Sequence, residues 1–336
     1  MQRLNRQYRL AARPTGLPSR EDWHFTEEPV REIRDGEILV DVMYISLDPA
    51  MRGWMNDAKS YIAPVAIGEV MRAGGAGRVV ESRNGDFAEG DHVTGSFGVQ
   101  EYAISDGKGV RRVDPAVVPL PKYLGVLGMP GMTAYFGLLD IGKPQAGQTV
   151  VVSGAAGAVG SAVGQIAKIK GCRAVGIAGG KAKCEHVVGE LGFDACVDYK
   201  SGDVRQSLAA QCPGGIDVYF DNVGGAILDA ALARLALRAR VVICGAISQY
   251  NATAGVKGPA NYLSLLVNRA SMTGMIVFDY AARYGEAVAE LGEWMRSGKL
   301  VSREEIVRGL DNFPEALLML FRGENTGKLV LALDKA

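Results

Sequence analysis

The pattern of hydrophobic and polar positions changes near residue 125. Before that point, short apolar or weakly alternating stretches are separated by turn-forming residues, and this pattern predicts short strands. We expect them at residues 8–13, 37–45, 77–82, 91–97 and 99–104. Many short strands at this spacing are typical of a β-barrel or a sandwich-like domain.

From about residue 123 onward, apolar strands alternate with helices. Residues 148–153 form a nearly continuous apolar run, as expected of a strand that a parallel sheet buries on both faces. Helices are expected at 160–170 and 183–191, and further strands at 172–177, 195–199, 216–220 and 239–244. This regular alternation predicts a doubly wound parallel sheet. A helix over 313–321 and a strand over 328–333 then return the chain to the first pattern.

A glycine-rich motif follows the apolar strand at 148–153 and opens the next helix. Residues 153–160 read Ser-Gly-Ala-Ala-Gly-Ala-Val-Gly, and this context is typical of dinucleotide-binding sites. Gly157 corresponds to the second glycine of this motif, which lets the backbone approach the pyrophosphate. Gly160 corresponds to the third glycine, which lets the helix pack closely on the sheet. Ala155 occupies the position of the first glycine. The helix N-terminus would bind the phosphates through its N–H groups. A purely structural turn is the alternative.

The end of the second strand of this pattern distinguishes NADPH from NADH. An NAD site carries an acidic residue about 20 residues past the motif, to bind the ribose hydroxyls. Residues 178–183 instead read Ala-Gly-Gly-Lys-Ala-Lys. Lysine attracts a 2′-phosphate, so this segment favours NADPH. The alternative is that Lys181 and Lys183 only begin a solvated helix.

Composition and charge exclude several classes of protein. The 37 basic residues balance 37 acidic ones, which argues against a protein whose main task is to bind nucleic acid or anionic lipid. The 5 cysteines are widely spread and form no C-x-x-C motif, so we expect free thiols in a reducing compartment and no metal site. Cys184 and His186 are the nearest approach to a zinc ligand pair, but two residues apart on a helix they point away from each other.

The sequence also predicts where the protein works. No run of about 18 apolar residues is present, so we expect no membrane span. Arginines without acids in the first twenty residues superficially resemble a transit peptide. The weak alternation at 8–13, closed by prolines, favours a first strand instead, and we expect a cytoplasmic protein.

Six segments together resemble the medium-chain dehydrogenase/reductase superfamily, and within it the zinc-free alkenal/prostaglandin reductase branch (leukotriene 12-hydroxydehydrogenase-like). They occur in order over essentially the whole chain, at residues 46–53, 128–137, 155–160, 219–225, 244–251 and 323–328. The resemblance implies a GroES-like β-barrel catalytic domain at 1–125 and 300–336, wrapped around a Rossmann NADP-binding domain at 126–299. It also implies a homodimer that pairs through the Rossmann domains.

The resemblance further implies the residues of the cofactor and substrate sites. Lys183 would contact the 2′-phosphate, with Tyr199 beside it, and Asn325 would close over the nicotinamide. The remaining NADP(H) contacts would be Ala156, Gly157, Ala158, Val159, Gly160, Gly180, Asn222, Cys244, Gly245, Ala246, Ile247, Ser248, Tyr250, Ile276, Val277 and Phe278. The substrate channel would be lined by Ala50, Met51, Arg52 and Trp54. Ala50 departs from the family, because many relatives carry an aromatic residue there.

The family reaction implied by the resemblance is metal-independent hydride transfer from NADPH to the β-carbon of an α,β-unsaturated ketone or aldehyde. The negative charge that develops on the carbonyl oxygen then needs hydrogen-bond donors. Tyr250 and Tyr262 are the candidate catalytic donors, since a phenol with a pKa of about 10 stays protonated at neutral pH. The alternatives are that Tyr250 only covers the cofactor cleft, that Tyr262 packs on its helix, and that Arg52 forms a structural ion pair.

Three functional hypotheses follow. The first is an enone/alkenal reductase acting on a small apolar substrate, and the second is an NADPH:quinone oxidoreductase of the same superfamily. The third is a non-catalytic NADPH-binding sensor, against which the complete set of cleft motifs argues. The products formed with an enone and with a quinone distinguish the first two.

Overall fold

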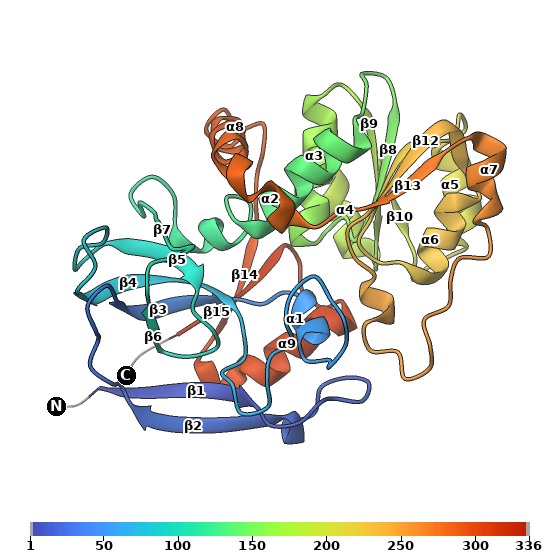
Figure 1. Ribbon diagram of the computed structural model, residues 1–336. Helices are drawn as coiled ribbons and strands as arrows, with labels where there is room; N and C mark the ends of the chain where they lie inside the picture. Colours follow the sequence, from blue (N-terminus) through green and yellow to red (C-terminus); the bar gives the residue numbers. More distant parts are fainter. Residues whose placement is uncertain (1–2, 334–336) are drawn as a thin grey trace. The chain divides into compact units, whose positions relative to one another are not determined.

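The computed structural model describes residues 3–333, which separate into two compact units (Figure 1). The first unit contains the described residues up to Leu124 and those from Glu304 onward, and the second unit is Gly125–Arg303. The chain thus divides after Leu124 and after Arg303, where the sequence predicts divisions after residues 125 and 299.

The first unit is built on a mixed seven-stranded sheet and a separate two-stranded one. The larger sheet has the order β14-β15-β3-β4-β5-β7, with β6 also paired to β3, and β1 pairs with β2 in the smaller sheet. The strands are β1 (Leu4–Leu10), β2 (Trp23–Pro29), β3 (Ile38–Ser46), β4 (Gly74–Ser82), β5 (His92–Ser96), β6 (Tyr102–Ser105), β7 (Arg111–Arg112), β14 (Glu304–Arg308) and β15 (Lys328–Ala332). The helical segments are α1 (Ala50–Trp54), α9 (Phe313–Arg322), η1 (Arg20–Asp22), η2 (Leu120–Leu124) and η6 (Leu310–Asn312).

A strand from late in the sequence completes this sheet. β15 runs antiparallel to β3, with Val330 opposite Ser46, and parallel to β14. Next to the pairing, the buried ammonium group of Lys328 donates to the carboxylate of Asp48 and to the carbonyl oxygen of Leu47, both at 2.7 Å. This buried ion pair fixes β15 to the segment that follows β3.

The first strand differs from its prediction. The alternation suggested residues 8–13, whereas β1 is Leu4–Leu10, in register with β2 from Leu4 opposite Pro29 to Leu10 opposite Trp23. The chain turns after Leu10, where the N–H of Ala11 donates to the carbonyl oxygen of Asp22 at 2.8 Å. Pairing with β2 therefore determines where this strand begins and ends. Because β2 itself was not predicted, the bounds predicted for the first strand were wrong.

Helix α9 covers the hydrophobic core of the first unit. Its buried residues Phe313, Ala316, Leu317 and Leu320 follow the spacing of one helix face. Phe313 packs against Tyr8 and Trp23, with ring centroids 5.2 and 5.0 Å apart. The predicted helix at 313–321 thus anchors the β1–β2 hairpin to the rest of the unit.

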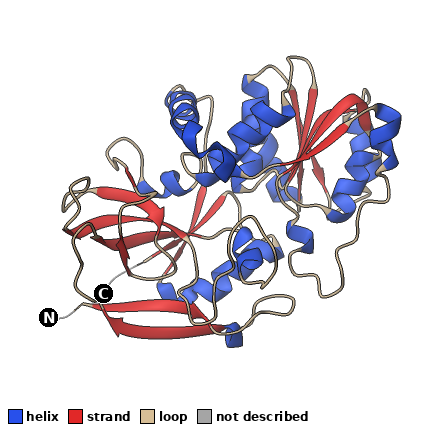
Figure 2. Ribbon diagram, viewed as in Figure 1, coloured by secondary structure: helices blue, strands red, loops and turns tan. Residues whose placement is uncertain are grey.

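The second unit contains a six-stranded parallel sheet in the order β10-β9-β8-β11-β12-β13, with helices on both faces (Figure 2). Its strands are β8 (Thr149–Ser153), β9 (Arg173–Ala178), β10 (Ala195–Asp198), β11 (Ile216–Asp221), β12 (Leu235–Ile243) and β13 (Ser271–Gly274). Its helices are α2 (Met129–Phe136), α3 (Ala158–Ile169), α4 (Lys181–Gly189), α5 (Val204–Gln211), α6 (Gly225–Leu232), α7 (Leu263–Asn268) and α8 (Tyr284–Arg296). The shorter segments are the π-helix η3 (Gly137–Gly142), η4 (Ile247–Gln249) and η5 (Val277–Arg283). The predicted doubly wound parallel sheet is confirmed.

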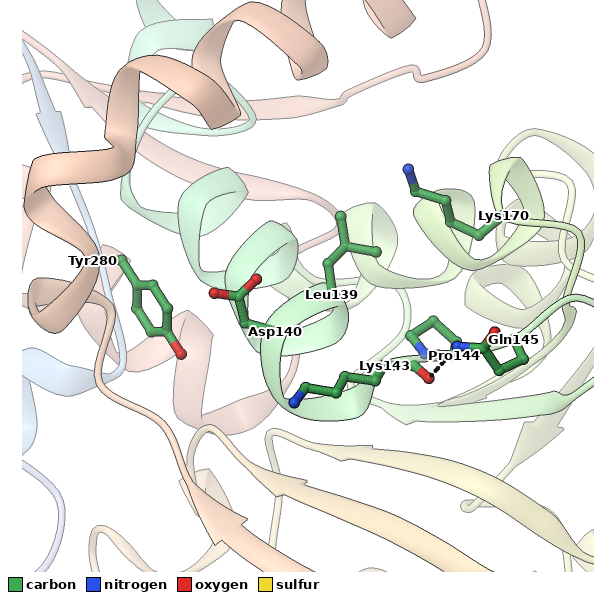
Figure 3. A pocket seen from close by; sticks show the side chains of 7 residues that line it. All are labelled: Leu139, Asp140, Lys143, Pro144, Gln145, Lys170 and Tyr280. Carbon is green, nitrogen blue, oxygen red and sulfur yellow. Dashed lines mark hydrogen bonds between the residues drawn. The ribbon is translucent and has the colours of Figure 1, made fainter.

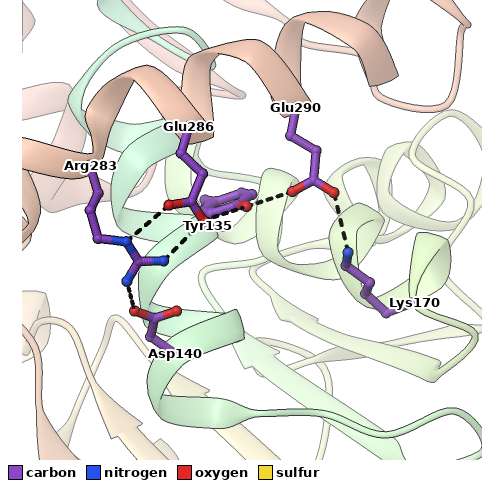
Figure 4. Close-up of polar contacts among 6 residues, drawn as sticks. All are labelled: Tyr135, Asp140, Lys170, Arg283, Glu286 and Glu290. Carbon is purple, nitrogen blue, oxygen red and sulfur yellow. Dashed lines mark hydrogen bonds and ion pairs between the residues drawn. The ribbon is translucent and has the colours of Figure 1, made fainter.

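A polar network joins α8 to α2, η3 and the end of α3 (Figure 4). The Tyr135 hydroxyl donates to Glu290 at 2.5 Å, and Glu290 accepts from Lys170 at 3.4 Å. Arg283 pairs with both Asp140 and Glu286. Burial and the neighbouring carboxylates raise the pKa of Tyr135, so its hydroxyl remains a donor at neutral pH. These contacts fix α8 on the edge of the unit.

Candidate active site

The order of the parallel strands creates a switch point between β8 and β11. From β8 the chain proceeds to β9 and β10 on one side, and then to β11, β12 and β13 on the other. In such sheets, ligands bind at the carboxyl ends of the strands beside this point. Ser153, the last residue of β8, and Asn222, directly after β11, meet there: the Asn222 side-chain amide donates to the Ser153 carbonyl oxygen at 2.7 Å.

The predicted cofactor residues of this unit all follow carboxyl ends of these strands. Residues 156–160 follow β8, Gly180 and Lys183 follow β9, and Tyr199 follows β10. Asn222 follows β11, residues 244–250 follow β12, and residues 276–278 follow β13. The fold therefore brings segments far apart in sequence to one edge of the sheet.

In the turn after β8, the backbone at Gly160 lies so close to Gly154 that only glycine fits. A Cβ atom on Gly160 would lie 2.3 Å from the carbonyl oxygen of Gly154, and one on Gly157 would lie 3.2 Å from the same oxygen. Gly157 is the N-cap of α3, so no capping side chain covers the N-terminus of this helix. The N–H groups of the first helical turn have no partner within the helix, so they can bind a pyrophosphate group. The turn fits the phosphates of a dinucleotide.

A buried carboxylate joins the ends of β8 and β11. Asp221 is 1% exposed, and its Oδ1 accepts from the hydroxyls of Ser153 and Tyr219 at 2.8 and 2.9 Å. The same oxygen accepts from the N–H groups of Val223 and Gly224 at 3.1 and 3.0 Å. Burial raises the pKa of Asp221, whereas these hydrogen bonds act in the opposite direction.

Asp221 and Ser153 are site residues that the sequence analysis missed. Both occur in motifs that carry the family resemblance or lie next to them, at the ends of predicted strands. A carboxylate that follows an apolar strand was the available signal. Its role became visible only once β8 and β11 were known to be neighbours.

Replacing Asp221 by asparagine is expected to destabilise the protein by about 2 kcal/mol, because the amide NH2 group would replace Oδ2, which accepts from the N–H of Gly224 at 3.1 Å, and would leave that buried donor facing another donor. Urea denaturation of the variant and the parent measures this loss. Asp217→Asn is the control, since Asp217 lies on the same strand and accepts from the N–H of Thr149 at 2.8 Å. A larger loss in the control than in Asp221→Asn would contradict the role assigned to Asp221.

The segment after β9 contains the predicted 2′-phosphate contacts. Gly180, with a φ of 97°, is the N-cap of α4, and its N–H donates to Oδ1 of Asp198 at 2.7 Å. Hydrogen bonds from the backbone N–H groups of Gly180 and Lys200 lower the pKa of Asp198, which stays ionised and holds the turn. Lys183 lies half-buried in the first turn of α4.

Tyr199 lies against the same turn. A Cβ atom on Gly179 would lie 2.6 Å from the Tyr199 hydroxyl oxygen, so a side chain there would displace the ring. The tyrosine is partly exposed. Gly179, Gly180, Lys183 and Tyr199 therefore belong to one local surface, as a site for the adenosine end of NADP(H) requires.

The loop after β12 is tied to the turn after β11. The N–H groups of Cys244 and Gly245 donate to the carbonyl oxygen of Asp221 at 2.9 and 3.0 Å. The Ser248 hydroxyl donates to the carbonyl oxygen of Val223 at 2.6 Å. The hydroxyl oxygen of Tyr250 accepts from the N–H of Ala246 at 3.1 Å. Tyr250 is thus oriented by its own loop.

The second candidate catalytic tyrosine occupies a different place. Tyr262 is 57% exposed and directly precedes α7, which packs on β12. Its neighbour Asn261 donates through its backbone and side chain to Asp229 of α6. Tyr262 is therefore anchored beside α6 and α7, and Tyr250 in the loop after β12. A catalytic role for either tyrosine stays a prediction.

The predicted substrate-lining residues form α1 in the first unit. Met51 and Trp54 are buried in its hydrophobic core, and Ala50 packs against that core. The guanidinium group of Arg52 donates to the carbonyl oxygens of Pro14 and Gly16 at 2.9 and 3.0 Å, so it holds the loop before η1. The structural alternative for Arg52 thus has direct partners in these backbone carbonyl groups.

Asn325 lies between α9 and β15, and its side chain donates to the carbonyl oxygen of Gly327 at 3.1 Å. Its place over the nicotinamide and the substrate contacts of α1 stay predictions.

The second unit also carries a surface hollow (Figure 3). It has a volume of about 690 Å³ and is lined by Leu139, Asp140, Lys143, Pro144, Gln145, Lys170 and Tyr280. No predicted site residue lines it. Among residues 3–333, no group of three or more His, Cys, Asp or Glu side chains is arranged to hold a metal ion.

Comparison with known proteins decides the family. A family model described as the N-terminal domain of oxidoreductase matches residues 6–113, and one described as zinc-binding dehydrogenase matches residues 158–293. The chain is 46% identical to the NADPH-dependent curcumin reductase of Escherichia coli (strain K12), over 97% of this chain and 96% of that protein. The chain belongs to the medium-chain dehydrogenase/reductase superfamily.

Two further comparisons place it within the zinc-free, NADP-dependent alkenal/prostaglandin reductase branch of this superfamily. It is 38% identical to the NADP(+)-dependent 2-alkenal reductase of Nicotiana tabacum, over 98% of each chain. It also matches the crystal structure of CurA in complex with NADPH from Vibrio vulnificus, with a TM-score of 0.94 and 46% identity over 98% of this chain and 100% of that one. The family resemblance predicted from the sequence is confirmed.

Proposed function

We propose that this protein is an NADPH-dependent reductase of the C=C bond of α,β-unsaturated ketones and aldehydes, and that it needs no metal ion. The main support is the glycine turn after β8, in which Gly160 lies too close to the backbone of Gly154 to carry a side chain. The NADPH-dependent relatives support the cofactor, and the curcumin and 2-alkenal reductases support the substrate class. When bound, NADPH supplies the hydride that reaches the β-carbon of the substrate.

The residues of the chain bind and orient the reactants. The first turn of α3 binds the pyrophosphate, Lys183 and Tyr199 bind the adenosine phosphate, and Asn222 with the loop 244–250 borders the nicotinamide. The Tyr250 hydroxyl donates a hydrogen bond to the substrate carbonyl oxygen, where negative charge develops. Loss of one such donor typically lowers the rate by about 10²–10³-fold.

Purified protein treated with a chelator is expected to oxidise NADPH in the presence of an alkenal or an enone, and more slowly to oxidise NADH. The rate is measured by the loss of nicotinamide absorbance, and the product is identified as the saturated carbonyl compound. A quinone is the matched control substrate. Turnover with the quinone alone would indicate a quinone oxidoreductase, and NADPH binding without any turnover would indicate a sensor.

We further propose that the protein is a homodimer and that its interface is the exposed edge of the second unit. β13 is the last strand of its sheet, and all four of its residues are exposed. On α7, Leu266 and Val267 are 75% and 69% exposed. An open strand edge beside exposed apolar side chains fits a second copy of the same surface.

The double variant Leu266→Glu/Val267→Glu is therefore expected to have half the mass of the parent in light scattering after gel filtration. Val117→Glu is the control, since Val117 is 72% exposed in the first unit and undergoes the same chemical change. A parent protein that has the mass of one chain at micromolar concentration would contradict the homodimer.

We also propose a cytoplasmic location. All five cysteines are free thiols, as expected in a reducing compartment. In the part of the chain that the structure describes, no helix is long and apolar enough to cross a membrane.

A further inference from the structure

Two cysteines of the second unit lie in direct contact. The sulfur atoms of Cys184, on α4, and Cys196, on β10, are 2.9 Å apart. Both thiols are free and half-buried. A disulfide bond has a sulfur–sulfur distance of about 2.05 Å, so the two atoms need to move by only about 0.9 Å to form one.

This pair lies directly beside the proposed adenosine-phosphate site. Cys184 follows Lys183 in the first turn of α4. Cys196 lies two residues before Asp198, whose carboxylate accepts from the N–H of Gly180, the N-cap of α4. The sulfur contact therefore joins the same two elements that the Asp198–Gly180 hydrogen bond joins.

We propose that Cys184 and Cys196 are a site of reversible oxidation, at which a hydroperoxide forms an intramolecular disulfide that weakens NADPH binding. The oxidation site stands on the contact between the thiols alone. Its effect on NADPH rests on the proposed function, because it requires that Lys183 bind the 2′-phosphate.

The chemistry proceeds in two steps. The Cys184 thiolate attacks one peroxide oxygen, the O–O bond breaks, and a sulfenic acid and hydroxide are formed. The Cys196 sulfur then attacks the sulfenic sulfur, the S–S bond forms, and water leaves with the proton of Cys196. In total, two thiols and one hydrogen peroxide give one disulfide and two waters. A thiol reductant reverses the reaction.

The surroundings assign the first step to Cys184. Burial raises the pKa of both thiols, and raises that of Cys196 far more. A hydrogen bond from Cys196 opposes this rise for the pKa of Cys184, because it stabilises the Cys184 thiolate. Cys184 is therefore the better nucleophile, and Cys196 is in contact with it to resolve the sulfenic acid.

The disulfide affects NADPH binding through the backbone. The new bond pulls the first turn of α4 toward β10 and fixes it there, so the side chain of the adjacent Lys183 leaves its position for the 2′-phosphate. Coupling between two sites is reciprocal, and bound NADPH must therefore make the disulfide harder to form by the same factor.

The test treats the purified full-length protein with hydrogen peroxide and compares it with the reduced protein. Digestion without reductant, followed by mass spectrometry, is expected to show a peptide pair linked through Cys184 and Cys196, which dithiothreitol separates. The Kd for NADPH, measured by nicotinamide fluorescence, is expected to rise at least about fivefold on oxidation, the lower end of typical coupling. The Kd should return to the value of the reduced protein after dithiothreitol is added.

Three variants serve as controls. Cys184→Ser and Cys196→Ser should bind NADPH like the reduced parent before and after peroxide, and Cys212→Ser, which removes a buried thiol elsewhere in the unit, should respond like the parent. Absence of the linked peptide, or a linked protein with an unchanged Kd, would overturn the proposal. A reduced protein that does not bind NADPH would overturn the proposed cofactor and the coupling, while the peptide map still reports the disulfide.

Discussion

Replacing Lys183 by alanine is expected to weaken NADPH binding by about 10- to 100-fold, the range for loss of a hydrogen bond between charged groups. Lys183 lies in the first turn of α4, directly after the Gly179–Gly180 turn at the end of β9. No acidic side chain is present at residues 178–183 to bind ribose hydroxyls in its place. Because NADH lacks the 2′-phosphate, its Kd should stay nearly unchanged. The two Kd values are measured by titration of nicotinamide fluorescence.

Lys181→Ala is the matched control for this prediction. Lys181 begins the same helix, but its side chain is 88% exposed and pairs with Glu185 at 3.7 Å. Its removal should change the Kd for NADPH by less than about threefold, because exposed ion pairs contribute little. An equal loss for both cofactors in Lys183→Ala would show that the lysine supports the fold of the turn and does not read the 2′-phosphate.

Replacing Gly160 by alanine is expected to weaken NADPH binding by about 10- to 100-fold, because a displaced turn loses hydrogen bonds between its backbone N–H groups and the charged pyrophosphate. The added Cβ would lie 2.3 Å from the carbonyl oxygen of Gly154 and 2.8 Å from its carbonyl carbon. Both atoms belong to the backbone, so the turn itself must move away from α3. Overpacking of this kind should also reduce the free energy of unfolding by about 1–3 kcal/mol.

Gly292→Ala separates this effect from the general cost of changing a glycine in a helix. Gly292 lies within α8, and no atom lies within 4 Å of the position that its Cβ would take. The control should leave the Kd for NADPH unchanged and stabilise the helix by up to about 1 kcal/mol. Urea denaturation and NADPH titration of both variants test the prediction. Unchanged binding in Gly160→Ala would remove the glycine turn as the support for the proposed function.

The sequence predicted the central strands of the second unit well, because burial determines their composition. β8 is apolar along nearly its whole length, and it was found within one residue of its position. β13 was not predicted, since Ser271–Gly274 are all exposed and follow no apolar period. Its identity as a strand depends on pairing with β12, which no local pattern encodes.

The site was predictable where motifs mark strand ends, and less so where contacts join distant segments. The Ser153–Asn222 contact and the bonds to Asp221 depend on β8 and β11 being neighbours although 68 residues separate Ser153 from Asp221. Nothing in the 11 residues between Cys184 and Cys196 indicates their contact, so the sequence predicts only free thiols there. Met51 and Trp54, which are predicted to line the substrate channel, lie in the hydrophobic core of the first unit, and their substrate contacts stay predictions.

The pairing of β15 with β3 has a consequence for the order in which the protein folds during synthesis. β3 leaves the ribosome early, but its partner β15 is made only after the whole second unit, whose own sheet comes from one continuous stretch of chain. Contacts between residues so far apart form slowly. We therefore expect the second unit to fold first. Until β15 is made, the edge of β3 that it covers stays unpaired, where it can pair with a wrong strand or bind chaperones.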